Sequence, residues 1–529
     1  MTRPAVTTIN GAATDPSCRR FARGAFAAPV TSRGGQRLIW QMLKPLSSEQ
    51  WNFSAAAHLL NRAGFGGAPA EIERLAALSP PAAVAKLTDY PDTPESVFKP
   101  DWAKPDPEHV EKLRAAKDAT PEQRKEMVRD FQREQRRQML ELQEAWLQRM
   151  ATGPHPLQEK LTLFWHGHFA TSVTKVKDAY YMWRQNDLFR RLGAGDWLTL
   201  LREVTRDPAM LVWLDQAQSK PEHPNENYAR ELMELFTLGE GNYTEQDVTE
   251  AARALTGLTL DRLHQEPTFR PRLRDARNKT IFGQTGNFNG DDLLRLIVAR
   301  PQSARFITGK LWRHFAGTEP SPELAEVLAA EFRRHDNRFR PFLRTLFLSE
   351  EFHSPAVVRQ QIKSPVQLLV MACRQLEREL PPALVTANAL RTLGQEPFNP
   401  PNVKGWDGGI AWINTNTLLN RHNLALLLTT GENSLPATPR KAAAKKLAER
   451  VLGRLSPHAA NADKIFTPED RKSPDRLLAV VERRFLNAPL RAQDRAALTD
   501  YLHAQGDLDN HDLLGLIRLA MCTADYQLA

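Results

Sequence analysis

The chain has 529 residues, of which 41% are hydrophobic and 25% are charged. This is ordinary globular composition, and it excludes a chain that is disordered throughout. The net charge is +9, from 71 Lys and Arg against 62 Asp and Glu, and the two signs are mixed along the sequence. The absence of a Lys/Arg block argues against a nucleic-acid-binding arm, so we expect no specific nucleic-acid partner. No run approaches the roughly 18 apolar residues of a membrane span, so we expect a soluble protein without a transmembrane segment.

The first 45 residues differ from the rest of the chain. Residues 1–45 are rich in Gly, Pro, Ala and Thr and show no sustained hydrophobic period, so we predict a disordered tail. Within it, Arg19 and Arg20 precede a short apolar stretch, a weak export signal that leaves both a cytoplasmic and an exported location open. Three widely spaced cysteines, Cys18, Cys373 and Cys522, form no CxxC pair and indicate no disulfide framework.

Helical periodicity begins after residue 46. Ser47 and Gln50 have capping-box spacing, and the first helix should end at the glycines of 64–67. Two short helices are expected in 69–89, and the prolines and charges of 90–119 are typical of a linker. Thr120, Pro121 and Gln123 then predict the start of a long charged helix that runs to about Met150.

The remaining elements are again helical. Helices are predicted at 156–168, 178–192, 195–205, 226–238, 245–256, 290–298, 302–315, 321–333, 340–350, 363–377, 441–454, 474–486, 491–504 and 510–522. Residues 259–283 are the best place for a small hairpin, and 386–416 form a long irregular loop rich in Pro and Gly.

These elements predict an all-α (mainly α) fold, a multi-helix globular bundle with that long loop and at most a small hairpin. We divide the chain into the tail at 1–45, a main helical domain at 46–430, a linker at 431–440 and C-terminal helices at 441–529 that pack on the main domain.

Several sequence blocks occur together in one order. They are AAHLLNRAGFGG (56–67), LQEKLTLFWHGHFATS (157–172), DPAMLVWLD (207–215), the block PNENYARELMELFTLGEGNYTEQDVTEAARALTG (224–257), FNGDDLLRLIVARPQSARFITGKLWRHF (288–315) and FNPPNVKGWDGGIAWINTNTLLNRHN (398–423). Over roughly residues 50–425 the chain resembles the bacterial domain of unknown function 1800 family.

The resemblance implies a bacterial protein and no particular chemistry. It also implies, as an expected partner, a sulfatase-like protein encoded nearby. Family members commonly carry His-Asp-x-Gly-x-Lys after the long motif, whereas here Arg274 and Arg277 flank Asp275 and the motif ends at Lys279, without the His and the Gly.

The helix after Pro224 has one polar face. At 100° per residue, Glu226, Asn227, Arg230, Glu231 and Glu234 fall on one side, opposite Leu232, Leu235 and Phe236. One interpretation is a solvated face with weak ion pairs four residues apart. The other turns this face into a cleft, where Arg230, Glu231 and Glu234 are catalytic. Asn225, Asn227 and Tyr228 then bind substrate near the helix N-terminus, where backbone N–H groups favour an anion.

A second candidate is the pair His166 and His168, which is flanked by aromatic residues. The two are either core histidines or catalytic acid–base groups, and we assign them as catalytic. We assign no metal. If a metal is bound, both histidines should ligate it, with Glu231 or Glu234 completing the site.

A third candidate lies in the loop at 400–414, where Trp406 and Asp407 are assigned to substrate binding. An exposed Trp406 would make a stacking platform for a sugar or a base, whereas a buried one would fasten the loop to the helices.

Motifs of serine hydrolases, P-loop NTPases and zincins are missing, and the sequence identifies no cofactor. The resulting hypothesis is a hydrolase or lyase that acts on a bacterial or extracellular glycan with a His/Glu/Arg acid–base site. The alternative is a non-catalytic scaffold or partner-binding protein whose polar residues form a buried network. An enzyme should place these residues in a cavity of several hundred Å³, with a histidine within about 8 Å of the polar face after Pro224.

Overall fold

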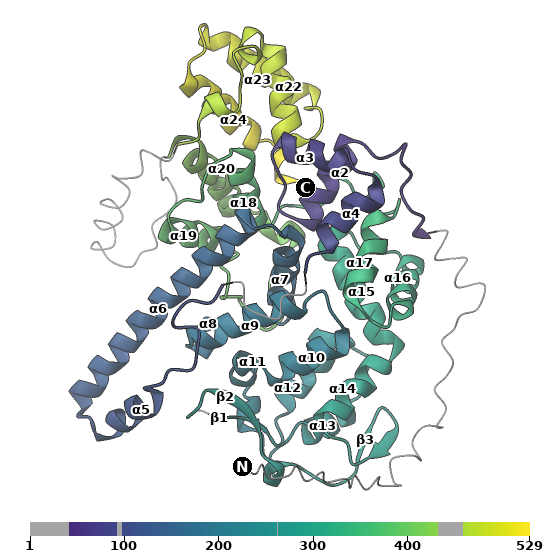
Figure 1. The fold of residues 1–529 in the computed structure, drawn as a ribbon, viewed down its shortest axis with the longest axis vertical. Helices are drawn as coiled ribbons and strands as arrows, with labels where there is room; N and C mark the ends of the chain where they lie inside the picture. Colours follow the sequence, from purple (N-terminus) through teal and green to yellow (C-terminus); the bar gives the residue numbers. More distant parts are fainter. Residues whose placement is uncertain (1–41, 92–97, 262, 432–458) are drawn as a thin grey trace, which may run out of the picture.

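The computed structural model describes residues 42–91, 98–261, 263–431 and 459–529, and these residues are mainly helical (Figure 1). Two antiparallel hairpins are described, both close to the predicted position. One pairs β1 (Leu258–Asp261) with β2 (Glu266–Phe269), and the other pairs β3 (Lys279–Ile281) with β4 (Gln284–Gly286). The predicted mainly α fold is therefore confirmed.

Two predictions concern residues outside the described ranges: most of the tail at 1–45, and the linker at 431–440 with the helix at 441–454. The described chain begins with an ordered contact. Leu43 and Leu46 are buried, and the N–H of Leu46 donates to the carbonyl of Leu348 at 2.7 Å. Ordered packing thus starts a few residues before the expected boundary at 46.

The N-terminal helices are α2 (Phe53–Ala63), α3 (Pro69–Ala76) and α4 (Pro80–Thr88). They are followed by α5 (His109–Asp118), a helix inside the segment for which we predicted a linker. The prolines of that segment all precede α5, so they allow this short helix although they gave the segment a linker-like composition. The predicted cap of the long helix α6 (Pro121–Thr152) is present, since Thr120 and Gln123 form a capping box. Helices α5 and α6 project together from one side of the molecule (Figure 1).

The centre of the molecule is built around α7 (Pro156–His168). It is followed by α8 (Val173–Val176), α9 (Ala179–Leu192), α10 (Trp197–Arg206), α11 (Pro208–Trp213), α12 (Glu226–Glu231), the π-helical turn η3 (Leu232–Thr237), α13 (Glu245–Ala254), α14 (Gly290–Ala299), α15 (Pro301–Ala316), α16 (Pro322–Arg334) and α17 (Phe339–Leu348). Leu161 and Trp165 of α7 pack in one hydrophobic core with α10–α17, while Leu163 packs in a second core with α6 and α18. Because α7 lies between two cores, nearly all its side chains are buried, including the polar ones.

The C-terminal part completes the second core. It contains α18 (Pro365–Gln375), α19 (Ala383–Leu393), α20 (Thr415–Thr430), α22 (Pro474–Val481), α23 (Ala492–Gln505) and α24 (Asn510–Met521). Helix α24 contacts α20, and Ile362 forms a β-bridge with Leu528. The end of the described chain therefore packs against the segment that precedes α18.

Candidate functional site

A cavity of about 830 Å³ opens beside α7. Its walls come from α7, α15, the segment 360–367 and the loop 404–412. Its charged lining residues are Lys160, Lys310, Arg313, Lys404, Glu319 and Asp407. The two carboxylates each pair with an exposed cation at the rim, Glu319 with Arg313 at 2.8 Å and Asp407 with Lys404 at 3.2 Å. Among the described residues, no carboxylate forms an ion pair with Lys160 or Lys310, so both amino groups lack an acidic partner in the cavity.

His168 lines this cavity and contacts the helix after Pro224 through its backbone. Nε2 of His168 lies 3.0 Å from the carbonyl oxygen of Phe236, so this nitrogen carries the proton and donates. Phe236 and Leu235 belong to η3, at the end of a helix whose last carbonyls have no partner within the helix. His168 and Lys310 supply donors to these two carbonyls.

Lys310 joins His168 in a polar pair. Its Nζ donates to the carbonyl of Leu235 at 2.9 Å and lies 3.3 Å from Nδ1 of His168, which accepts. Burial, followed by the nearby Arg313 and Lys404, lowers the pKa of Lys310 to about 7. Burial also lowers the pKa of His168 well below its usual value, so this imidazole is neutral. Lys310 can therefore exchange a proton with a group in the cavity near neutral pH.

His166 points to the other side of α7. The N–H of Phe398 donates to its Nε2 at 2.8 Å, and its ring packs among those of Trp146, Phe398 and Trp406. Burial lowers the pKa of His166 to about 3. Its accepting nitrogen is occupied by the backbone, so the geometry supports a role in fastening the loop at residue 398 to α7.

The expected joint metal ligation by His166 and His168 does not fit this arrangement. Helix α7 continues through both residues, and side chains two positions apart on a helix point about 200° apart. Each imidazole also has its own partners in the protein. The predicted pairing with Glu231 or Glu234 is replaced by contacts to Phe398 on one side and Phe236 on the other.

The loop residues Trp406 and Asp407 lie at the cavity, together with Trp412. Trp406 is half-buried, and Asp407 is exposed in its ion pair with Lys404. Gly405 has a φ of 85°, and a Cβ there would lie only 2.1 Å from the carbonyl oxygen of Gly167. The loop is thus held on α7 by a close backbone contact that only glycine permits.

The polar face after Pro224 is engaged elsewhere. Arg230 forms a bidentate ion pair with Glu245, at 2.7 and 2.8 Å, and Glu234 accepts a hydrogen bond from Tyr243 at 2.7 Å. Glu231 is half-buried, and burial and the neighbouring Glu234 raise its pKa. None of these three acid or base candidates belongs to the cavity lining, as far as the described residues show.

The three candidates for substrate binding near the start of α12 have structural partners. Asn225 is the N-cap: its side chain accepts from the N–H of Asn227 at 2.9 Å and donates to the carbonyl of Leu214 at 2.7 Å. Tyr228 is fully buried, and its hydroxyl donates to Thr205 at 2.9 Å. The segment 164–169 therefore meets the helix after Pro224 at the backbone of the last turn of that helix. The side chains of Asn225 and Tyr228 instead serve the helix cap and the hydrophobic core.

Sequence reasoning missed the two cavity lysines, although the pattern holds a signal for them. Lys160 falls at the helical spacing of Leu157, Leu161 and Phe164, and Lys310 falls at that of Ile307 and Leu311. A lysine in the apolar register of a helix is rarely buried without a reason.

Lys160 lies at the inner end of the cavity and is 2% exposed. Its Nζ donates to Gln367 at 3.0 Å and lies 4.9 Å from the centre of the Phe65 ring. Burial, with a contribution from the nearby Arg62, lowers the pKa of Lys160 to about 7. The ammonium form is therefore disfavoured in the folded protein.

This lowered pKa predicts a pH-dependent stability. Between pH 7 and pH 10.5 the unfolded chain keeps the Lys160 proton and the folded one releases it, so the free energy of unfolding should rise with pH. The slope from this group is at most about 1.4 kcal/mol per pH unit. Lys160→Met should remove it, as measured by denaturant unfolding of both proteins at the two ends of the range. The same pH dependence in the two proteins would contradict the prediction.

The residues from Arg274 to Lys279, which the resemblance matched to a His-Asp-x-Gly-x-Lys motif, form a structural network. The carboxylate of Asp275 pairs with Arg253 at 2.9 Å and also with Arg277, and these hydrogen bonds hold its pKa well below its usual value. Nζ of Lys279 donates to the carbonyls of Asp275 and Arg277. Arg277 thus supplies a partner for Asp275 within the stretch that lacks the usual His and Gly.

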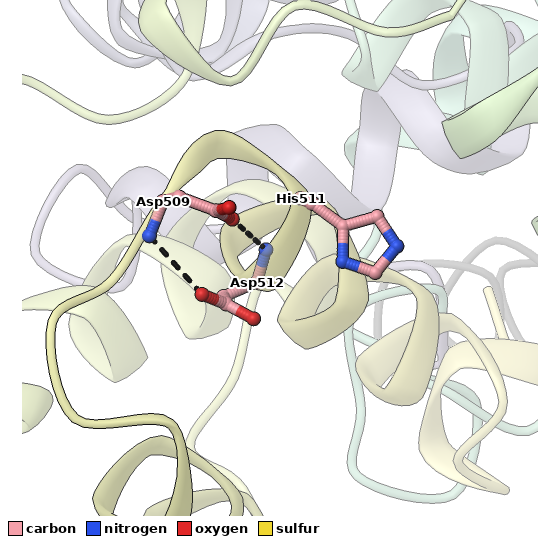
Figure 2. A group of neighbouring side chains, drawn as sticks. All are labelled: Asp509, His511 and Asp512. Atoms are coloured by element: carbon pink, nitrogen blue, oxygen red, sulfur yellow. Dashed lines mark hydrogen bonds between the residues drawn. The ribbon is translucent and has the colours of Figure 1, made fainter.

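Asp509, His511 and Asp512 bring three potential metal-ligand atoms within 4.8 Å of one another (Figure 2). The two carboxylates already form a capping box at the start of α24, each accepting a backbone N–H of the other residue. The group is exposed or half-buried, and its geometry is explained by the helix cap.

In the described parts of the chain, no helix has the length and apolar character needed to cross a membrane. The fold and the cavity define a mainly α-helical protein with a lysine-lined pocket beside α7, the helix that lies between the two hydrophobic cores. Residues 58–528 match one family model, described as a protein of unknown function (DUF1800). The match spans nearly the whole chain, so the protein belongs to the DUF1800 family. No curated protein and no solved structure matches it.

Proposed function

We propose that the protein is an acid–base enzyme, a lyase acting on a glycan, with Lys310 as the group that transfers the proton and His168 as its hydrogen-bond partner. The observation that carries this proposal is the arrangement around Nζ of Lys310. Two acceptors, Leu235 O and His168 Nδ1, occupy two N–H bonds. A neutral amine has two N–H bonds and one lone pair, so the lone pair is left for a group in the cavity.

The reaction that suits this pair is proton abstraction from an activated carbon. Lys310 takes the proton, the C–H electrons form a C=C bond, and the C–O bond at the next carbon breaks. The departing oxygen receives a proton from the ammonium of Lys310 or from water. A pKa near 7 matches a general base that works near neutral pH.

Glycoside hydrolysis suits the cavity less well. It commonly uses two carboxyl groups, one of them a protonated acid. Among the described lining residues, Glu319 and Asp407 are the only carboxylates, and both are exposed and in ion pairs at the rim. We therefore favour the lyase within the hydrolase-or-lyase hypothesis, and we leave Arg230, Glu231 and Glu234 out of its chemistry.

Trp406 and Trp412 support a carbohydrate as the substrate. Both line the cavity, and tryptophan rings offer flat apolar faces to sugar rings. The sulfatase-like partner implied by the family resemblance remains part of the proposal. Co-purification of the two proteins would test it.

The alternative function, a non-catalytic scaffold, is favoured by a different set of residues. His166, Asn225 and Tyr228 are occupied by hydrogen bonds within the protein, as a structural network requires. These residues do not account for the cavity or for the uncompensated Lys310.

The experiment is a panel of neutral and acidic bacterial polysaccharides incubated with the purified full chain. A lyase produces unsaturated sugar ends, which absorb in the ultraviolet, together with new reducing ends. A hydrolase produces reducing ends without that absorbance. Reducing ends alone would overturn the lyase, and neither product with any polysaccharide would favour the scaffold.

A further inference from the structure

The inner end of the cavity gathers basic side chains, and among the described residues no carboxylate side chain pairs with them. Lys160 and His314 line it, and Arg62 lies directly behind Gly317, another lining residue. A Cβ at Gly317 would lie 2.8 Å from Nη2 of Arg62. Arg62 is completely buried.

Several polar atoms at this end are buried without a hydrogen-bond partner. They are Nη2 of Arg62, Nε2 of His314 and Oε1 of Gln361. The other groups of Arg62 are used, since Nε donates to the carbonyl of Phe315 and Nη1 donates to the main-chain oxygen of Ala529. Gln367 accepts one N–H bond of the Lys160 amino group, which has at least one more to donate. Buried polar atoms left unpaired cost stability, so this concentration of them at a cavity needs an explanation.

The packing of Lys160 on Phe65 and Gln367 does not provide that explanation. A cation–π contact and one neutral hydrogen bond stabilise an ammonium only in part, and desolvation of a buried charge costs more unless an opposite charge is present. Neither contact involves Arg62 or His314. An anion at this point would serve all three groups.

We propose that this inner end is an anion subsite, in which Lys160, His314 and Arg62 hold a carboxylate, sulfate or phosphate group of the ligand. The unpaired Oε1 of Gln361 accepts a hydrogen bond from a hydroxyl group of the same ligand. The inference rests on the proposed function, and it makes the substrate an acidic saccharide.

The position of the subsite relative to the proposed base suits one ligand. His314 follows Lys310 by four residues on α15, which is about 6 Å along the helix axis. The ring of Phe164 lies between His314 and His168, the hydrogen-bond partner of Lys310; it is stacked on His168 and tilted against His314, with centroid distances of 5.8 and 5.1 Å. An acidic group held at His314 therefore places the adjoining carbon atoms near Lys310. The positive charge of this subsite would also stabilise the carbanion character that develops on the ligand when Lys310 takes a proton.

The test uses inorganic sulfate and inorganic phosphate, titrated calorimetrically into the full chain. Two further ligands, glucuronate and neutral glucose, distinguish a carboxylate from the sugar itself. We expect the three anions to bind, glucose to bind more weakly, and Lys160→Met to weaken anion binding at least about tenfold through loss of a charge-assisted hydrogen bond. The control is Lys86→Met, which removes an exposed lysine of α4 outside the cavity.

Equal anion affinity in Lys160→Met and the wild type would overturn the subsite. The variant should fold, because it removes a buried charge at nearly constant volume. If it does not, His314→Gln is judged by the same tenfold criterion. Turnover of polysaccharides is measured on the same preparations. Anion binding without turnover would support the anion subsite and contradict the proposed enzyme. Turnover without anion binding would support the enzyme and contradict the subsite.

Discussion

Replacing Lys310 by Met should lower the rate of glycan cleavage by roughly 10²–10⁴-fold, the usual contribution of a general base. Met keeps most of the volume of the side chain but has no lone pair that can take a proton at neutral pH. Lys310→Arg should not restore the rate, because the guanidinium stays protonated. The measurement is kcat against pH on the polysaccharide identified in the panel. The acidic limb of this pH profile should follow the Lys310 pKa of about 7.

The matched control is again Lys86→Met, which leaves the cavity intact. Two results would contradict the role of Lys310. One is a rate in Lys310→Met within a few-fold of the wild type. The other is full activity in Lys310→Arg, which would show that the position needs positive charge and no proton transfer.

Replacing Glu159 by Ala should lower the free energy of unfolding by about 3–5 kcal/mol, the cost of leaving a buried charge unpaired. Glu159 is 1% exposed and accepts hydrogen bonds from Arg149 at 2.8 Å and from Arg190 at 3.0 Å. The side chain of Arg190 is itself only 3% exposed. Denaturant unfolding monitored by circular dichroism measures the change.

Glu134→Ala provides the comparison, since Glu134 forms an ion pair with Arg137 at 2.6 Å on the exposed surface of α6. An exposed pair of this kind contributes about 0–1 kcal/mol. A similar loss in both variants would mean that burial does not set the value of the Glu159 ion pairs. The prediction that the buried ion pairs of Glu159 stabilise the centre of α7 would then be wrong.

Local signals predicted the helices well. The start of α6 follows from Thr120, Pro121 and Gln123, which are adjacent in sequence and form the observed cap. The hairpins near 259–283 follow from a local change in composition. Helix α5 was missed because its polar sequence has no strong apolar period and follows several prolines. Helix α19 was also missed, since it overlaps the stretch 386–416 for which we predicted an irregular loop, and no helix was predicted for α20. These successes and failures all depend on residues within one or two helical turns.

The site was predicted only in part, because its contacts join distant parts of the chain. His168 meets Lys310 across 142 positions, and His166 meets Phe398 across 232. Histidine spacing and aromatic neighbours pointed to a segment that lines the cavity, but they could not indicate that the two imidazoles face different cores. The polar face after Pro224 was correctly placed on a helix. Its partners, Glu245 and Tyr243, lie close by in sequence, and only the folded chain shows that they satisfy it locally.

The close contact between Gly405 and Gly167 has a thermodynamic consequence for binding. Together with the hydrogen bond from Phe398 to His166, and that between Ser172 and Asn399 at 2.8 Å, it anchors one wall of the cavity before any ligand arrives. A ligand that contacts Trp406 therefore does not have to order this loop, and it avoids the loss of chain entropy that accompanies closure of a mobile lid. Its affinity depends instead on how well its shape fits a wall that is already in place.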